Sequence, residues 1–374
     1  MKKAVDSVDH RQIYFPETNV LITRFGSADS AAQVTDFMPV HEFHEEGGGL
    51  RQIEIEDLSG KDARIVRLAQ GVLGETNMRM DCKPAFDFAS TSHQVERVEG
   101  GVILTSDTGE RLSLTAPCEF TIEDGAATAE FTLDHGESMA FVLERLATPE
   151  DSPTSFTADE ADEQFRETVS FWRAWVSKCT YQGRWREDVI RSLLALKLLT
   201  FSPTGAIIAA PTASLPEEIG GERNWDYRYC WIRDAALTID AFMRMGYVDE
   251  ARGFMRWLGA RTREANQSSD RPLQIMYGIR GEHKLEEKSL DHLSGYRDSK
   301  PVRVGNGAYD QFQLDIYGEL MESVYIYNRH GWPISYDMWM SLSGILDLVS
   351  KNWQEPDEGF GKFRVGESSL FTRS

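Results

Sequence analysis

Short segments of alternating apolar and polar residues fill the first part of the chain. They run from about Thr18 to Glu144 and include NVLITRFGS, ARIVRLAQGV, RLSLTA and SMAFVLERL. Turn-forming clusters such as Asp107-Thr108-Gly109 separate them. A period of two indicates strands with one buried face, and many short strands at regular spacing are typical of an antiparallel sandwich. The pattern therefore predicts an antiparallel β-sandwich domain over residues 1–150.

The periodicity changes after Leu146. The segment ATPEDSPTSFTADEADE is polar and carries two prolines, which indicates a linker. Apolar residues then recur at helical spacing, first at Phe165, Val169, Trp172 and Val176. Further helices are predicted at residues 185–200, 234–246, 248–263, 308–329 and 336–352. The pattern thus predicts a helical second domain over residues 151–374.

The predicted helices are of two kinds, and long loops separate them. The helix from Asp234 is apolar on nearly every side, which predicts burial all round, whereas those at 248–263 and 308–329 have one apolar face. This mixture suggests two concentric helical layers. Loops of roughly fifteen to forty residues are long for a compact helical domain, and such loops are more often functional than idle.

The first long loop ends in RNWDYRYCWIRD at 223–234, which holds four aromatic residues, three arginines and two aspartates. The rings could simply fill the core, with Asp234 capping the next helix. Arginines, however, are costly to bury without partners. Aromatic faces beside arginine and aspartate are also what a sugar pocket needs, because rings stack on the apolar face of a sugar while the polar groups hold its hydroxyls.

Two later loops, 271–307 and 351–359, carry further polar and aromatic residues. Gln311 and Asp315 stand just before or inside the helix that follows the first of these loops. Each such residue alone is more typical of a loop anchor or a cap than of a ligand contact. Together they indicate a second rim of the same pocket. The candidate substrate contacts in these loops are Tyr277, Arg303, Asn306, Trp353 and Asp357.

Charge and cysteine content narrow the possible partners. The net charge of −20 argues against a protein that binds nucleic acid or anionic lipid, because both attract basic surfaces. The four cysteines form no CxxC pair, which fits a reducing compartment and excludes a cysteine-based zinc site. HEFHEE at 41–46 lacks HExxH spacing and is predicted to be a solvated loop. With no signal-peptide core and no apolar run of about 18 residues, we expect a cytoplasmic chain without metal, nucleic acid or membrane partners.

Three loop motifs resemble glycoside hydrolase family 15, the group of glucoamylases, glucodextranases and bacterial trehalases. They are RNWDYRYCWIRDAAL, LDHLSGYRDSKPVRVGN and NWQEPDEG, in this order, and the resemblance runs from about residue 11 to Gly359. It implies a β-sandwich followed by an (α/α)6 barrel whose loops surround a terminal glucose. By the same resemblance, Trp231, Arg233 and Asp234 hold that glucose. The family inverts the anomeric centre with one carboxylic acid and one carboxylate, so no cofactor is implied.

The chain departs from the family after PDEG. The resemblance places Ile-Trp-Glu there, with its glutamate as the general acid, but the sequence has Phe360-Gly361-Lys362. Lysine is normally cationic and is a poor substitute for a carboxylic acid. Codons for Gly359–Phe363 can be written so that a shift of one base reads Ile-Trp-Glu-Val, so we predict a frameshift over residues 360–374. The family's general base falls in a later part of the barrel, so we expect an incomplete (α/α)6 barrel and a chain truncated at both ends.

The resemblance predicts hydrolysis of a terminal α-glucosidic bond with inversion. Glucoamylase-type action on maltose- or isomaltose-type ends is the first expectation and α,α-trehalose the alternative, because both substrates present the same non-reducing glucose. Without its acid and base, this chain is expected to be inactive. Rival interpretations are a sugar-binding remnant that keeps Trp231, Arg233 and Asp234, and a pseudogene product whose unpartnered apolar faces favour aggregation.

Overall fold

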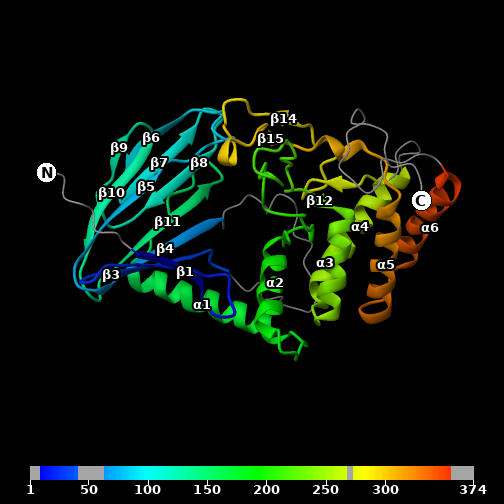
Figure 1. The fold of residues 1–374 in the computed structure, drawn as a ribbon, viewed down its shortest axis with the longest axis horizontal. Coiled ribbons are helices and arrows are strands. Elements are labelled where there is room, and N and C mark those ends of the chain that lie inside the picture. The colour runs from blue at the N-terminus through cyan, green and yellow to red at the C-terminus, as the bar shows by residue number, and fades with distance from the viewer. Residues whose placement is uncertain (1–8, 41–62, 268–272, 355–374) are drawn as a thin grey trace. The chain divides into compact units, whose positions relative to one another are not determined.

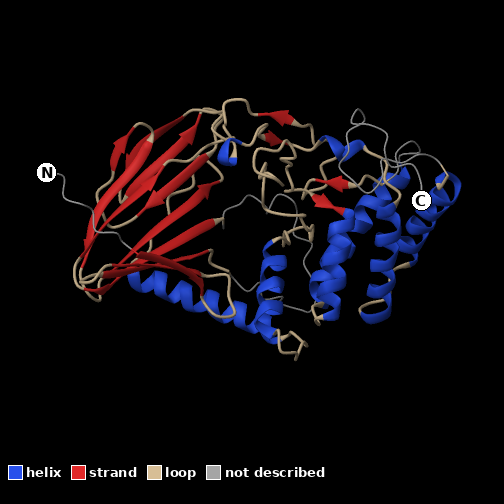
Figure 2. Cartoon of the chain, viewed as in Figure 1, coloured by secondary structure: helices blue, strands red, loops and turns tan. Residues whose placement is uncertain are grey.

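The computed structural model describes residues 9–40, 63–267 and 273–354 of the 374-residue chain. It divides the chain into two compact units, Met1–Ser177 and Lys178–Ser374. Strands dominate the first unit and helices the second (Figure 1, Figure 2). The predicted order, an antiparallel β domain followed by a helical domain, is confirmed. Closure of the helices into an (α/α)6 barrel stays a prediction.

The described strands of the first unit form two antiparallel sheets. They are β1 (Asp9–Tyr14), β2 (Leu21–Gly26), β3 (Ala31–Phe37), β4 (Arg64–Leu73), β5 (Thr76–Cys82), β6 (His93–Val98), β7 (Gly101–Ser106), β8 (Arg111–Thr115), β9 (Thr121–Glu123), β10 (Ala126–Leu133) and β11 (Ser138–Leu146). The larger sheet has the order β1-β2-β3-β4-β11-β8-β7-β6, and the smaller sheet has the order β5-β10-β9.

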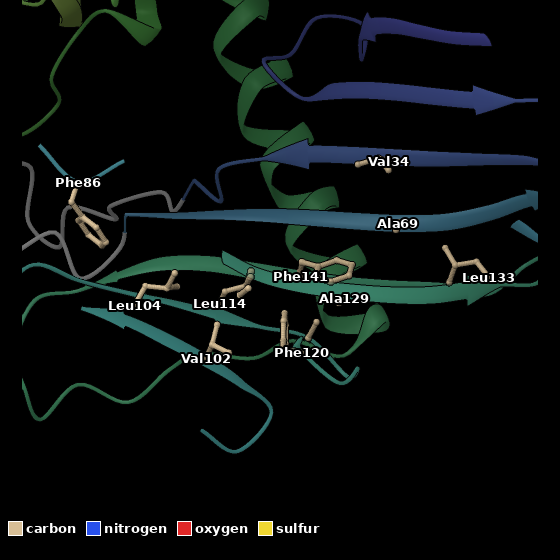
Figure 3. Close-up of a cluster of buried hydrophobic side chains, with 12 residues drawn as sticks. Val34, Ala69, Phe86, Val102, Leu104, Leu114, Phe120, Ala129, Leu133 and Phe141 are labelled. Carbon is tan, nitrogen blue, oxygen red and sulfur yellow. The ribbon is translucent and has the colours of Figure 1, made fainter. Parts of the chain in front are cut away.

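Both sheets contribute to one hydrophobic core (Figure 3). Leu114 of β8 and Phe141 of β11, from the larger sheet, belong to the same buried cluster as Ala129 and Leu133 of β10, from the smaller sheet. The rings of Phe131 and Phe141 lie 5.2 Å apart between their centroids. Alternate residues of each strand therefore face this shared core, which is the arrangement that the period of two predicts.

Helix α1 (Ala158–Ser177) begins inside the segment predicted to be a linker. Thr157 and Glu160 form a capping box, in which Glu160 Oε2 accepts from the Thr157 backbone N–H at 2.8 Å and Thr157 Oγ1 accepts from the Glu160 N–H at 3.2 Å. The apolar face of α1 packs against β4 and β11. The first compact unit therefore extends to Ser177, whereas the sequence placed the domain boundary after residue 150.

The described helices of the second unit are α2 (Arg186–Leu198), α3 (Ile232–Arg244), α4 (Val248–Gln267), α5 (Asp315–His330) and α6 (Tyr336–Asn352). Two-residue strands pair as β12 (Cys230–Trp231) with β13 (Met276–Tyr277) and as β14 (Lys288–Ser289) with β15 (Arg303–Val304). Helix α3 packs against α4 and α5, and α6 packs against the same two helices (Figure 1). No helix in the described part of the chain is both long and apolar enough to cross a membrane.

The helix predicted at 308–329 begins later, at Asp315. The side chain of Asn306 accepts a hydrogen bond from the backbone of Ala308 at 3.1 Å and starts a separate 3-10 turn over Gly307–Asp310. Gln311 then returns to an extended conformation, so the two helical segments do not merge. Local capping thus overrides the apolar spacing that predicted one helix.

Helix α3 differs from its predicted environment. Ile239 and Phe242 are completely buried, but Leu237 on another face is 58% exposed. Within the described residues the helix therefore has one buried side rather than burial all round. The predicted arrangement in two concentric layers stays a prediction.

Candidate functional site

A short strand holds the first turn of α3 in place. Strand β12 pairs antiparallel with β13, and the Ile232 N–H extends this contact by donating to the Ile275 carbonyl at 2.9 Å. The chain passes directly from strand to helix at Ile232. The next two side chains, Arg233 and Asp234, consequently lie in the first helical turn, where the backbone is anchored to a second segment of the chain.

Arg233 lies between two carboxylates. Its Nη1 donates to Asp315 Oδ2 at 2.6 Å, and its Nε lies 3.8 Å from Asp234 Oδ2. Asp315 is the first residue of α5, which packs against α3, so the two acids come from the first turns of neighbouring helices (Figure 1). Helix N-termini carry partial positive charge and therefore favour carboxylates. The site brings one guanidinium and two carboxylates together from two rigid elements.

These three side chains remain partly accessible. The exposed fraction is 43% for Asp234, 21% for Arg233 and 14% for Asp315. Asp234 Oδ2 and Asp315 Oδ1 are buried atoms that have no hydrogen-bond partner among the described residues. Buried polar atoms are normally satisfied, and an ionised carboxylate can only accept hydrogen bonds. The arrangement therefore suits a ligand that donates several hydrogen bonds, as the hydroxyl groups of a sugar do.

The environment of Asp234 disfavours its charge. Burial raises the pKa of the Asp234 carboxyl above its ordinary value, and the negative charge of Asp315 adds to the increase. The positive charge of Arg233 and a backbone N–H act in the opposite direction, without cancelling the effect of burial. Hydrogen bonds donated by a ligand would stabilise the ionised carboxylate.

Trp231 does not present the open stacking face that the sequence led us to expect. Its side chain is buried, with an exposed fraction of 2%. The ring is tilted by 40° against that of Tyr227, with 6.3 Å between their centroids. Because Trp231 directly precedes α3, this packing supports the turn that carries Arg233 and Asp234.

Tyr277 lies on β13, the strand that pairs with β12. It is opposite Cys230 in the β12–β13 pair and is completely buried. Its hydroxyl accepts a hydrogen bond from the Gln274 backbone at 2.9 Å, and its ring meets Trp257 and His283 edge to face. Burial raises its pKa well above the ordinary value. The structure thus gives Tyr277 a place in the core, and its contact with a ligand stays a prediction.

Arg303 joins the two long loops. Its guanidinium lies 4.9 Å from the ring centre of Trp225, its Nη1 donates to the Glu222 carbonyl at 2.7 Å, and its Nε lies 3.1 Å from Glu287 Oε1. The residue is buried. These contacts occupy the guanidinium with protein groups, so Arg303 acts here as a loop anchor.

Asn306 takes part in a neighbouring clamp around Asp226. Its Nδ2 donates to the Asp226 carbonyl at 3.1 Å. The completely buried Asp226 carboxylate accepts from Arg228 Nε and Nη2 at 2.9 and 2.7 Å and from the Gly305 N–H at 3.1 Å. The structure thus brings the first and second loops side by side. Asn306, predicted to contact the substrate, here joins the two loops through its bond to Asp226.

The third loop contributes less to the described site. Trp353 follows the last turn of α6 and is 64% exposed. Asp357 and Lys362 lie outside the described residues. Of the predicted contacts, therefore, Arg233 and Asp234 are together and partly accessible, Trp231 lies directly beside them in the chain, and Tyr277, Arg303 and Asn306 support the loops.

Asp315 is the site residue that sequence reasoning did not connect with Arg233. The sequence indicates only that it stands just before or inside the next helix. One signal in the sequence could have linked them. Arg233 stands at the start of one predicted helix and needs an acidic partner if it is buried, and Asp315 is a carboxylate near the start of another predicted helix. In residues 9–40, 63–267 and 273–354, no three His, Cys, Asp or Glu residues come together as a set of metal ligands.

Comparison with known proteins identifies a family match. Residues 183–372, about half of the chain, match the sequence model described as "Glycosyl hydrolases family 15". This region includes all of the site described above.

Curated relatives extend the similarity to most of the chain. A trehalase from Mycolicibacterium smegmatis is 38% identical over 318 residues, which is 83% of this chain and 47% of that protein. A trehalase from Mycobacterium tuberculosis is 36% identical over 318 residues, or 83% of this chain and 46% of that protein. A trehalase from Thermoplasma acidophilum is 32% identical over 361 residues, or 95% of this chain and 57% of that protein. The chain spans about half the length of the curated relatives it matches.

Proposed function

Because the chain belongs to glycosyl hydrolase family 15, we propose that it carries the glucose-holding part of an inverting α-glucoside hydrolase. The observation that supports this most directly is the arrangement of Arg233 between Asp234 and Asp315. A glucose unit offers several hydroxyl donors at fixed spacing, which matches two carboxylate oxygens that have no hydrogen-bond partner among the described residues. Arg233 supplies donors for the oxygen atoms of the same sugar.

We propose α,α-trehalose as the substrate to test first. The relatives described above are named trehalases, and this reverses the order of substrates expected from sequence motifs alone, which put maltose- or isomaltose-type ends first. The geometry at Arg233 does not separate these sugars, because each can present a non-reducing glucose. Trehalose is therefore favoured by similarity, and binding of a glucose unit is favoured by the site.

We further propose that this chain alone holds a sugar without cleaving it. An inverting glycosidase places its general acid and general base about 6.5–9.5 Å apart on opposite sides of the bond. Asp315 is hydrogen-bonded to the Arg233 guanidinium and Asp234 lies at ion-pair distance from it, which suits holding a sugar rather than activating water across from an acid. By resemblance, the position of the general acid is held by Lys362, whose ammonium group is a poor substitute. On this proposal the chain by itself is a non-catalytic sugar-binding protein, in place of an active hydrolase.

Calorimetric titration with trehalose, maltose, isomaltose and glucose tests this proposal. We expect the 374-residue chain to bind trehalose, and Asp234→Asn to weaken that binding about tenfold or more, since a hydrogen bond to a charged group contributes about 1.5–3 kcal/mol. Asp240→Asn is the matched control, because Asp240 is on the same helix but pairs with Arg244 at the surface.

Two results would contradict the proposal in different ways. Binding of none of the four sugars would remove the proposed glucose site. Release of glucose from trehalose by the purified chain, lost in Asp234→Asn but not in Asp240→Asn, would overturn the non-catalytic part and leave the site in place.

A further inference from the structure

The position of Arg233 depends on what its long side chain binds. Of the two carboxylates beside it, only Asp315 lies within hydrogen-bond distance, at 2.6 Å from Nη1. Asp234 is 3.8 Å from Nε, which is an ion-pair distance and too long for a hydrogen bond. An arginine side chain has about 2 kcal/mol of rotamer entropy, so a well-placed carboxylate is needed to keep it in one orientation.

Asp315 is itself firmly placed. It is the first residue of α5, and the next two residues, Ile316 and Tyr317, are buried. The Tyr317 hydroxyl donates to the Leu273 carbonyl at 3.3 Å, which ties this turn to the segment before β13. The Asp315 side chain is short and 14% exposed. Its carboxylate is therefore fixed by the helix backbone in a way that the longer Arg233 side chain is not.

We propose that Asp315 is a positioning residue: it orients the Arg233 guanidinium toward the sugar. This inference rests on the proposed sugar site at Arg233 and Asp234. The bond from Asp315 Oδ2 to Nη1 restricts the orientation of the planar guanidinium fork, and a fixed fork is the geometry with which arginine binds neighbouring oxygen atoms. The negative charge of Asp315 acts on Asp234 at the same time.

Side-chain NMR of Arg233 tests the positioning role without any sugar. In the full chain labelled with 15N-arginine, Arg233→Lys identifies the Arg233 signals. We expect Asp315→Ala to increase hydrogen exchange of the Arg233 guanidinium about tenfold or more, and Asp315→Asn to have a smaller effect because its amide oxygen can still accept. Glu322→Gln is the matched control, an exposed acid on the same helix. Arg233 signals that are unchanged in both Asp315 variants would overturn the inference.

Sugar binding then separates this inference from the proposed function. For trehalose we expect the affinity to fall about tenfold in Asp315→Ala and less in Asp315→Asn. Removing the negative charge lowers the pKa of Asp234, so the pH midpoint of binding should move to lower pH in Asp315→Asn, a change that a merely structural role would not cause. If Arg233 responds but the wild-type chain binds no sugar, the proposed function fails and the positioning role stands. If wild-type binding is normal but both Asp315 variants match it in affinity and in pH midpoint, the positioning role fails.

Discussion

At the scale of single residues, Asp234 combines access to a ligand with a poor environment for its own charge. Its carboxylate is partly exposed, yet one oxygen is buried without a hydrogen bond among the described residues, and burial raises its pKa. Residues that bind ligands often reduce the stability of the folded state in this way. The consequence is a dependence of stability on pH that can be assigned to one side chain.

We predict that the change in melting temperature caused by Asp234→Asn, relative to the wild-type chain, is more positive at pH 7 than at pH 3.5. The folded-state pKa lies above the unfolded value of about 3.9, so the folded chain favours the protonated form. That stabilisation is fully present below the unfolded pKa and is lost as the pH rises through the folded pKa. Asparagine cannot ionise and avoids this loss. Scanning calorimetry should show a difference of about 2 °C or less between the two conditions, because the side chain is partly exposed.

The surface pair of Asp240 and Arg244 provides the control for this measurement. Asp240→Asn removes a carboxylate from the same helix without touching the candidate site. Equal changes in melting temperature at both pH values for Asp234→Asn would show that the environment of Asp234 does not penalise its charge.

At the scale of elements, the sequence predicts best where one local signal dominates. The apolar spacing at 336–352 gives the bounds of α6 as the structure has them, and the alternation in the first unit identifies strands that share a core. The start of α5 was misplaced because Asn306 caps its own short turn, which apolar spacing does not reveal.

The candidate site shows a different limit of sequence reasoning. Residue types single out Arg233 and Asp234 in one turn, but the bond to Asp315 joins residues that are 82 positions apart. Tyr277 and Arg303 have side chains suited to sugars, yet tertiary packing buries both of them. A single sequence shows which side chains are chemically capable, whereas burial and distant pairing decide which are available.

The clamp between the first two loops gives a prediction at this scale. Asp226→Asn should lower the free energy of unfolding by about 1–3 kcal/mol, because it removes charge-assisted bonds to Arg228 and turns a donor toward groups that already donate. Denaturant unfolding followed by circular dichroism measures the change. Asp310→Asn, an exposed position in the adjacent 3-10 turn, should change stability by less than about 0.5 kcal/mol. Equal stability of both variants would mean that the clamp is unimportant for folding.

At the scale of the whole molecule, helix α6 has apolar residues on two faces. Met338, Leu342 and Ile345 are buried. A second stripe at spacings of three and four residues carries exposed large side chains among serines. Apolar residues on two faces are typical of a helix that is covered on both sides. The stripe consists of Tyr336, Trp339, Ser343, Leu346, Ser350 and Trp353.

We expect this stripe to cause self-association of the isolated chain, because large exposed apolar surfaces favour association. The double variant Trp339→Lys/Leu346→Lys should reduce the weight-average mass in sedimentation experiments at high protein concentration. Asp337→Asn/Asp347→Asn is the matched control, since it changes the net charge equally at exposed polar positions of the same helix. A similar decrease in both double variants would assign the association to charge instead of the stripe.

The bond between Arg233 and Asp315 also makes the geometry of the candidate site depend on the distance between α3 and α5. Arg233 lies in the first turn of α3 and Asp315 in the first turn of α5, and the hydrogen bond between them is 2.6 Å long. Ala235 and Ala236, both buried, follow immediately in α3, which packs against α4 and α5. Bulkier side chains at these two buried positions would overpack the core next to the site and shift the first turn of α3. Selectivity among sugars could then evolve through core positions that never touch a sugar.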